Sequence, residues 1–393
     1  MSETWSKVDT KLVHAGEPQP RIGGAVAIPI FQSATFEYGG ESDYHDIRYI
    51  RLNNTPNHIA LHQKLAAIEG AESAIVAASG MGAISTTLLT LLSTGDHLLA
   101  QNCLYGGTHD LLTKDFKDFG IEYDFIDGDD PQSWESKLRP NTKAIYMETI
   151  ANPLLLVADL KSVVAFARKH KLISIIDNTF ASPINFRPCE HGFDLSLHSC
   201  TKYLNGHSDI VAGACIGKRD LVRQITRRLN HLGAALDPHA AFLLHRGMKT
   251  LALRVRHQNQ SALELARFLE SHPAVAKVNY PGLASHQRHQ RAKELFDGFG
   301  GVLSFELKNK EAAVADQVIA ATRLPIPAPS LGGVETLITR PSTTSHSGLS
   351  KEDRHQLGIS DNLIRVSVGI EAAEDLIADF RQALNQTAVL CPR

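Results

Sequence analysis

An acidic and a basic residue, Asp177 and Lys202, each follow a short apolar run, and twenty-five positions separate them. If both runs are strands of one parallel sheet, their ends meet at the edge where open α/β sheets bind ligands. Pyridoxal 5'-phosphate requires such a pair, because a lysine forms its covalent link and a carboxylate keeps its ring nitrogen protonated. In an isolated pair, a turn-capping aspartate and a solvated lysine would be the usual explanation. The segments around this pair favour instead a pyridoxal 5'-phosphate site with Lys202 as the catalytic lysine.

Two hydroxyls beside this lysine, those of Ser199 and Thr201, are predicted to bind the cofactor phosphate. The same segment forms a Ser-x-x-Lys pattern, and Ser-Asp-Asn occurs at 360–362, which are two of the three signatures of penicillin-recognising acyl-transfer enzymes. The third signature is missing, because the Lys-Thr pair at 249–250 is followed by leucine rather than glycine. A serine acyl-transferase of the Ser-x-x-Lys type remains an alternative with different chemistry.

Other candidate ligands follow further apolar runs. Gly80 and Met81 open a helix, so their backbone N–H groups are predicted to meet the phosphate at the positive helix end. Tyr105 is predicted to stack on the pyridine ring, although a buried core tyrosine fits the pattern too. Asn152 is predicted to bind the phenolic oxygen of the cofactor, with a turn-forming Asn-Pro pair as the alternative.

One arginine, Arg365, interrupts an otherwise apolar strand at 363–368. A planar guanidinium fixed on a strand suits bidentate binding of a substrate carboxylate. A buried salt bridge explains an arginine in this position equally well, so the sequence leaves both interpretations open.

The elements that must position these residues form an alternating pattern between residues 60 and 220. Short apolar runs alternate there with amphipathic segments such as the helical stripe at 160–167, which is typical of a mostly parallel α/β sheet. Expected strands cover residues 74–78, 97–101, 122–126, 144–147, 172–176, 195–198 and 211–216. The fold class is therefore α/β, with seven strands in the main sheet.

Three regions are expected along the chain. Residues 1–60 form an N-terminal arm that lacks periodic order and needs a partner surface, which indicates an oligomer. Residues 61–250 form the cofactor-binding α/β domain, and residues 251–393 form a smaller α+β domain. In and before the last region we expect strands at 301–307, 334–339 and 363–368, helices at 311–322 and 372–385, and one long helix at 240–270 interrupted near Gly247.

Composition excludes several classes of protein. Forty basic and forty-two acidic residues leave a net charge of -2, so no nucleic-acid partner is expected. Five cysteines without a Cys-x-x-Cys pair indicate a reducing, cytoplasmic compartment. The uncharged stretch at 73–95 holds eight Ser or Thr and three Gly, so it predicts a core element rather than a membrane span. The pair His286 and His289 lacks companion ligands, and no metal is predicted.

Taken in order, these segments resemble the Cys/Met-metabolism (transsulfuration) family of fold type I pyridoxal-phosphate enzymes, to which cystathionine γ-lyases and γ-synthases belong. The resemblance runs from residue 29 to residue 379. Its strongest blocks lie at 177–181, 198–209, 330–338 and 363–371.

The resemblance implies roles for individual residues. Tyr49 and Arg51 match the Tyr-x-Arg pattern that reaches into a neighbouring subunit, in a homotetramer built as a dimer of dimers. The amino-acid end of a small substrate is bound in the family by residues that match Asn152, Ser330 and Arg365. The other matches agree with the assignments above, namely Lys202 for covalent attachment and proton transfer, Asp177 for the ring nitrogen, Tyr105 for stacking, and Gly80, Met81, Ser199 and Thr201 for the phosphate.

Departures from the family pattern bear on the substrate. Arg48 stands before Tyr49, where cystathionine-cleaving relatives often carry an acidic residue, and Asp-Pro-His-Ala-Ala at 237–241 replaces Ser-Pro-Phe-Asp/Glu-Ala. Gly107 replaces the cysteine typical of methionine γ-lyases, and Leu331 stands where bacterial cystathionine β-lyases carry tryptophan. Glu335 resembles the glutamate of the γ-type members.

The match of Glu335 favours elimination at Cγ of a sulfur- or oxygen-substituted L-homoserine-type amino acid, such as cystathionine or homocysteine, giving a 2-oxo acid or homoserine-type product and the leaving group. The alternatives are γ-replacement, as in cystathionine γ-synthases or O-acylhomoserine sulfhydrylases, and, with less support, cystathionine β-lyase activity. A cofactor-binding protein without catalysis is a third class.

Overall fold

The computed structural model describes residues 5–388, which fold as two compact units. The first unit contains the residues up to Asn102, Gly107–Thr149 and Asp159–Ala252. The second contains Cys103–Gly106, Ile150–Ala158 and the residues from Leu253 onward. Two short segments of the N-terminal half therefore belong to the C-terminal unit.

A seven-stranded sheet forms the centre of the first unit, in the order β1-β7-β6-β5-β4-β2-β3. Strands β2 to β6 run parallel to one another, whereas β7 is antiparallel to both β1 and β6. The strands are β1 Ser73–Ala77, β2 His97–Gln101, β3 Glu122–Ile126, β4 Thr142–Glu148, β5 Ile173–Asp177, β6 Leu195–Ser199 and β7 Gly213–Gly217. The predicted mostly parallel sheet is confirmed, and each strand lies within two residues of its expected bounds.

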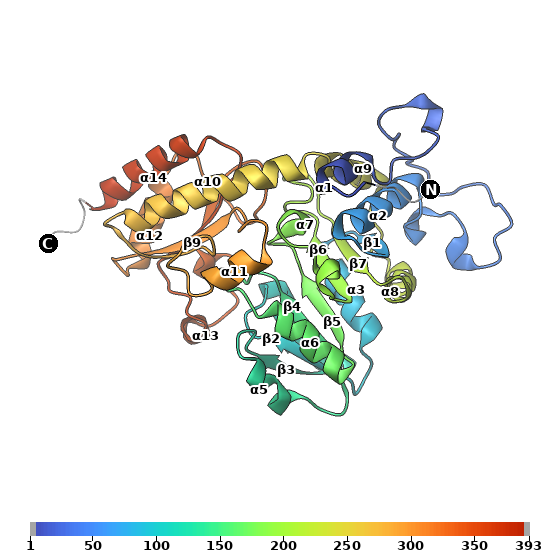
Figure 1. Cartoon of the computed structure of the whole chain (residues 1–393), viewed down its shortest axis with the longest axis horizontal. Helices are drawn as coiled ribbons and strands as arrows, with labels where there is room; N and C mark the ends of the chain where they lie inside the picture. Colours follow the sequence, from blue (N-terminus) through green and yellow to red (C-terminus); the bar gives the residue numbers. More distant parts are fainter. Residues whose placement is uncertain (1–4, 389–393) are drawn as a thin grey trace. The chain divides into compact units, whose positions relative to one another are not determined.

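Helices cover this sheet, so its central strands are buried on both faces. In Figure 1, α6 (Leu160–His170) crosses β4 and β5, on which it packs. Its sequence explains this position, because Val163, Val164 and Ala167 form a buried stripe and Asp159 caps its first turn. The other helices are α1 Val8–His14, α2 Pro56–Glu69, α3 Gly80–Leu91, α5 Pro131–Trp134, α7 Ser182–Asn185, α8 Arg219–Leu232 and α9 Pro238–Met248, with α4 Gly106–Asp110 at a unit boundary.

The segment between α1 and α2 consists largely of irregular loops that project from the first unit, drawn in blue in Figure 1. Several large apolar side chains on these loops are exposed, among them Val26, Tyr38 and Tyr44. The helix α1 was not anticipated in the arm, and it lies before the loops. A role of the arm in a neighbouring subunit stays a prediction.

The second unit contains a five-stranded sheet in the order β10-β11-β12-β9-β8. Its strands are β8 Val275–Asn279, β9 Val302–Leu307, β10 Ile326–Pro327, β11 Leu337–Thr339 and β12 Leu363–Ser367. All adjacent pairs are antiparallel except β10 and β11. The helices α10 Leu251–Ser271, α11 His289–Leu295, α12 Ala312–Ala321, α13 Lys351–Gln356 and α14 Ala373–Ala388 complete an α+β arrangement.

The expected helix at 240–270 is interrupted as predicted, but the interruption comes shortly after Gly247, because α9 ends at Met248 and α10 begins at Leu251. Gly247 does not cause the break, since it lies inside α9. A Cβ atom at Gly247 would come 2.4 Å from the carbonyl oxygen of Asn205, so glycine is required there by close packing.

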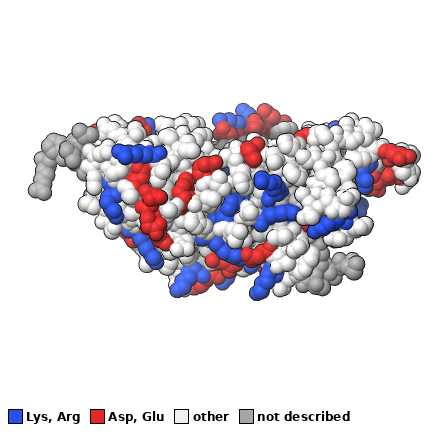
Figure 2. All heavy atoms as spheres, turned by 90° about the horizontal axis from the view of Figure 1, so that it is seen from above, with Lys and Arg blue, Asp and Glu red and all other residues white. Residues whose placement is uncertain are grey.

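Within residues 5–388, none of the helices combines the length and apolar character that crossing a membrane requires. Figure 2 shows basic and acidic side chains interspersed on the displayed face, in keeping with forty basic and forty-two acidic residues.

Candidate active site

The adjacent ends of β5 and β6 carry the first group of predicted site residues. Asp177 ends β5, Ser199 ends β6, and Asp177 pairs with Leu197 across the two strands. The Asp177 carboxylate is buried, and burial raises its pKa. The hydroxyl and the backbone N–H of Thr179, the latter at 2.9 Å, and the charge of His198 act in the opposite direction. A buried carboxylate of this kind gains from a cationic ligand, and a protonated ring nitrogen meets that requirement.

The start of α3 provides the second group. Ser79 caps this helix by accepting a hydrogen bond from the Gly82 N–H at 2.9 Å. A Cβ atom at Gly80 would lie 2.9 Å from the Cβ of Ser199, so the helix start packs directly against the end of β6. Because the first N–H groups of a helix have no intrahelical partner, Gly80 and Met81 present donors beside the Ser199 hydroxyl. This cradle fits a phosphate group.

A turn after β6 carries the third group. The Lys202 N–H donates to the carbonyl of Ser199 at 3.1 Å, and the Gly206 N–H donates to the carbonyl of Lys202 at 2.8 Å. Thr201 is fixed by Ala212, whose N–H donates to the Thr201 hydroxyl at 3.1 Å. Lys202 thus follows the strand that neighbours β5, at the same sheet edge as Asp177. The carboxylate, the phosphate cradle and the amine together suit pyridoxal 5'-phosphate.

A second cluster lies within the second unit, around the buried Arg365 of β12. Its Nη1 donates to Oδ1 of Asn152, and its Nη2 donates to the carbonyl oxygen of Ser330, both at 2.9 Å. The structure therefore brings together the three residues expected to hold the amino-acid end of a substrate. Two neutral oxygens orient the guanidinium, whose charge suits a carboxylate ligand.

The backbone at Ser330 is strained, with a φ of 106° that non-glycine residues rarely adopt. Its loop is fixed nearby, because the Gly332 N–H donates to the Ser367 hydroxyl at 2.9 Å. Glu335 follows on this loop and is partly buried. A Cβ atom at Gly369 would come 2.2 Å from the carbonyl oxygen of Val334, so this glycine permits close packing against the loop.

Tyr105, also in the second unit, has 46% of its surface exposed. This exposure excludes the interpretation as a core tyrosine, and stacking on a ligand stays a prediction. A Cβ atom on the next residue, Gly106, would lie 2.9 Å from the carbonyl oxygen of Ser345, so the chain can pass Ser345 only at a small residue.

The arm residues have their own contacts within the first unit. Arg51 donates to the carbonyl oxygen of Asn230 at 2.8 Å, contacts the hydroxyl of Tyr44, and lies over the ring of Tyr49 at 5.6 Å. Arg48 is exposed, with its guanidinium 5.7 Å from the ring centre of Phe36. These contacts tie Arg51 to the end of α8, so its role at a cofactor site stays a prediction.

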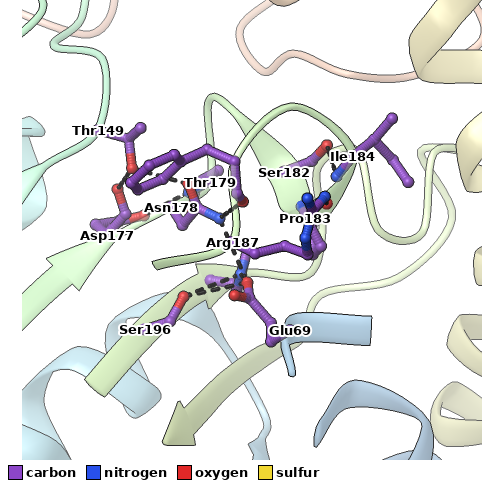
Figure 3. A network of polar contacts seen from close by, with 12 residues as sticks. Glu69, Thr149, Asp177, Asn178, Thr179, Ser182, Pro183, Ile184, Arg187 and Ser196 are labelled. Atoms are coloured by element: carbon purple, nitrogen blue, oxygen red, sulfur yellow. Dashed lines mark hydrogen bonds and ion pairs between the residues drawn. The ribbon is translucent and has the colours of Figure 1, made fainter. Parts of the chain in front are cut away.

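A buried polar network beside Asp177 was missed at the sequence level. It contains Glu69, Thr149, Asn178, Ser196 and His198, and Figure 3 shows most of its members. Asn178 and His198 lie in segments singled out for other reasons. Glu69 ends a helical segment that carried no chemical motif, and only its charge beside apolar residues could have drawn attention to it.

Residues 9–385 match the family described as Cys/Met metabolism PLP-dependent enzyme. The chain is 42% identical over 387 residues to the cystathionine beta-lyase MetC of Bacillus subtilis (strain 168), with 98% of both chains covered. It is 40% identical over 379 residues to the cystathionine gamma-lyase of the same organism, with 96% of this chain and 99% of the relative covered.

Among solved structures, cystathionine gamma synthase from Xanthomonas oryzae pv. oryzae, in complex with aminoacrylate and cysteine, superposes with a TM-score of 0.94. The sequence identity is 37%, and the match covers 99% of this chain and 100% of that chain.

The chain therefore belongs to the Cys/Met-metabolism family of pyridoxal-phosphate-dependent enzymes. It is a carbon–sulfur lyase of fold type I that uses pyridoxal 5'-phosphate. The family resemblance, fold class and cofactor predicted from the sequence are confirmed, and the acyl-transferase alternative is set aside. The roles of individual site residues stay predictions.

Proposed function

We propose that this enzyme eliminates the γ substituent of a sulfur- or oxygen-substituted L-homoserine-type amino acid, such as cystathionine or homocysteine. The main support for an amino-acid substrate is the Arg365 cluster, in which Asn152 and Ser330 orient a buried guanidinium. The choice of γ chemistry is supported by Glu335 and by Leu331 in place of tryptophan.

When bound, pyridoxal 5'-phosphate supplies an electron sink for the carbanion at Cα of the substrate. Asp177 holds the proton on the ring nitrogen, which its buried carboxylate favours through charge pairing. Arg365 binds the substrate carboxylate and thereby directs the Cα–H bond. The amine of Lys202, once released from the cofactor, accepts the Cα proton, so this amine must be neutral at that step.

Elimination at Cγ needs a second deprotonation, at Cβ, before the γ substituent leaves. We assign this proton transfer to Lys202 as well, because it is the basic group proposed at this sheet edge. Its amine would first have to pass the Cα proton on to the bound cofactor and so become neutral again. Tyr105, nearly half of whose surface is exposed, is proposed to stack on the ring of the bound cofactor and so help to orient it. Hydrolysis then releases a 2-oxo acid and ammonia.

Elimination at Cβ is the second candidate function. It is favoured by the 42% identity to a protein named cystathionine beta-lyase. Replacement at Cγ is the third, favoured by the likeness to a cystathionine gamma synthase structure. The three outcomes share the removal of the Cα proton and differ in which bond then breaks and in which nucleophile attacks next.

Cystathionine itself distinguishes the two eliminations. Cleavage at Cγ gives 2-oxobutanoate and cysteine, whereas cleavage at Cβ gives pyruvate and homocysteine. Separating the two keto acids by chromatography after turnover tests the proposal, and we expect 2-oxobutanoate to dominate. Pyruvate as the main product would overturn γ-elimination in favour of β-elimination.

Replacement is tested with an O-acylhomoserine in the presence and absence of cysteine. A γ-lyase releases 2-oxobutanoate from this substrate without a thiol, whereas a synthase forms cystathionine and little keto acid when cysteine is present. Homocysteine, methionine, cysteine and canavanine complete the panel and define the preferred leaving group.

We further infer a cytoplasmic homotetramer. The exposed apolar side chains of the arm support association with other subunits. Four of the five cysteines lie in the part of the chain that the structure describes, and all four are free thiols, which supports a reducing compartment.

A further inference from the structure

One buried carboxylate, that of Glu69 at the end of α2, connects the two strand ends that carry Asp177 and Ser199. Its Oε1 accepts hydrogen bonds from Nε2 of His198 at 2.6 Å, from the hydroxyl of Ser196 at 3.2 Å and from Nδ2 of Asn178 at 3.3 Å. Figure 3 shows Glu69 close to Ser196, below the segment that leads on from Asp177. The chemistry proposed above makes no use of this carboxylate.

The first branch of the network fixes the backbone after Asp177. The next residue, Asn178, donates through Nδ2 to Glu69 and, at 2.8 Å, to the carbonyl oxygen of Phe186. Its Oδ1 accepts from the Thr149 hydroxyl at 2.8 Å, and its N–H donates to Leu197 at 2.8 Å. Four hydrogen bonds thus restrain the residue that follows the Asp177 carboxylate.

The second branch reaches the end of β6. His198 directly precedes Ser199 and is buried. Because a carboxylate oxygen only accepts, Nε2 of His198 must carry the proton in its contact with Glu69. The charge of His198 also counteracts the burial that raises the pKa of Asp177. Glu69 is therefore linked to both strand ends, through the residue after Asp177 and the residue before Ser199.

We propose that Glu69 and His198 are positioning residues that hold Asp177 and Ser199 in register, so that the ring nitrogen and the phosphate of one cofactor are bound together. This inference rests on the roles proposed for Asp177 and Ser199, and is independent of which substituent the enzyme eliminates. A carboxylate is suited to the task, because one oxygen accepts several donors and its charge strengthens each bond. A carboxamide in the same place keeps an oxygen acceptor and loses the charge.

The test uses the Glu69→Gln holoenzyme without substrate. Two properties are measured: the visible circular dichroism per bound cofactor, which reports the orientation of the ring, and the cofactor dissociation constant, obtained by dilution. We expect the dichroism band to weaken or change sign and the dissociation constant to rise about tenfold, as for the loss of one charged hydrogen-bond partner.

A matched control is Glu17→Gln. Glu17 is a second buried glutamate of the same unit, paired with Lys249 at 2.6 Å and Lys64 at 3.9 Å. These partners and its other ion-pair partners, Arg21 and His245, all lie outside β5 and β6. This variant should lower the melting temperature while leaving the dichroism and the cofactor affinity at wild-type values.

The proposal is overturned if Glu69→Gln matches Glu17→Gln, with reduced stability and an unchanged cofactor band and affinity. If Glu69→Gln does not fold, His198→Gln removes the same link from the other side and is judged by the same two measurements. The dichroism of Asp177→Ala is measured in parallel. A wild-type dichroism band in that variant overturns the role of Asp177 itself, and with it this inference. The product assay on cystathionine tests γ-elimination, and its outcome is independent of this inference about Glu69 and His198.

Discussion

At the scale of single residues, the electron sink depends on Asp177, whose pKa burial raises. In Asp177→Ala, the covalent link through Lys202 remains, so the visible absorbance of the bound cofactor should persist. Turnover should fall by about a hundred- to a thousandfold, because an unprotonated ring accepts electrons poorly. Steady-state kcat together with the absorbance spectrum checks this, and a wild-type kcat would contradict the assigned role.

A second prediction at this scale concerns Arg365. In Arg365→Lys the charge is kept, but the two directed N–H groups that contact Asn152 and Ser330 are lost. We expect kcat/KM to fall by about ten- to a hundredfold, which corresponds to one hydrogen bond between charged groups.

The matched control is Arg340→Lys. Arg340 lies in the same unit, with 15% of its side chain exposed, and binds Asp316 through Nε at 2.9 Å and Nη2 at 3.1 Å. Its replacement should change kcat/KM by less than about twofold, since its hydrogen-bond partners include neither Asn152 nor Ser330. Equal losses in both variants would show a general effect of arginine replacement rather than substrate binding.

At the scale of elements, α9 packs closely against the turn that contains Lys202 and Asn205. A Cβ atom at Gly247 would come 2.4 Å from the carbonyl oxygen of Asn205, a backbone atom of that turn. We therefore expect Gly247→Ala to destabilise the protein by about 1–3 kcal/mol and to lower activity with it. Urea unfolding measures the first effect. Gly348→Ala, where a Cβ meets nothing within 4 Å, serves as the control and should change stability by less than about 0.5 kcal/mol.

Titration of a buried histidine on α9 yields another prediction. Burial, Lys64 and Lys249 lower the pKa of His245 to about 3, outweighing Glu17 at 3.7 Å. Since the unfolded chain binds this proton near pH 6.5 and the folded chain does not, stability should be complete above pH 6.5 and fall as the pH drops toward 3.

His245→Leu should reduce the slope of this fall by about 1.4 kcal/mol per pH unit, the effect of one proton. Urea unfolding at several pH values between 4 and 7.5 measures the slope. An unchanged slope in the variant would contradict the assignment, and other buried histidines with lowered pKa values, such as His62, would then account for it.

The elements also show how far the sequence could be interpreted. The bounds of β2 were predicted correctly to the residue, because a fully buried parallel strand leaves a strong local signal. The bounds of β3 were also predicted correctly, although β3 lies at the edge of the sheet and Ile126 is its one buried residue. The strand β8 was missed, since Ala276 and Lys277 are exposed and interrupt its apolar pattern. The expected ends of the two strands that became β5 and β6 lie within one residue of Asp177 and Ser199, so this part of the site could be located from the sequence. Glu69 was missed because its partners lie 109 to 129 positions away, and no local pattern records such a contact.

At the scale of the whole molecule, the exposed arm leads to a prediction about subunits. If Arg51 serves the site of a neighbour, a subunit with Lys202→Ala and a subunit with Arg51→Ala complement each other. In a twofold-symmetric hybrid, one site receives both altered residues and the other receives both intact ones. Random mixing of the two inactive proteins should then restore about a quarter of wild-type activity, because half of the pairs are hybrids and half of their sites are intact.

The mixing experiment needs proof that subunits have exchanged, which differently tagged copies and affinity capture of hybrids provide. Each variant is taken through the same exchange step alone and should remain inactive. Arg51 also donates to Asn230 within its own subunit, so Arg51→Ala removes a structural contact as well. Complementation separates the two effects, since a purely structural defect stays with the altered subunit and no hybrid site recovers. Captured hybrids without activity would therefore place Arg51 in the site of its own chain or in no site at all.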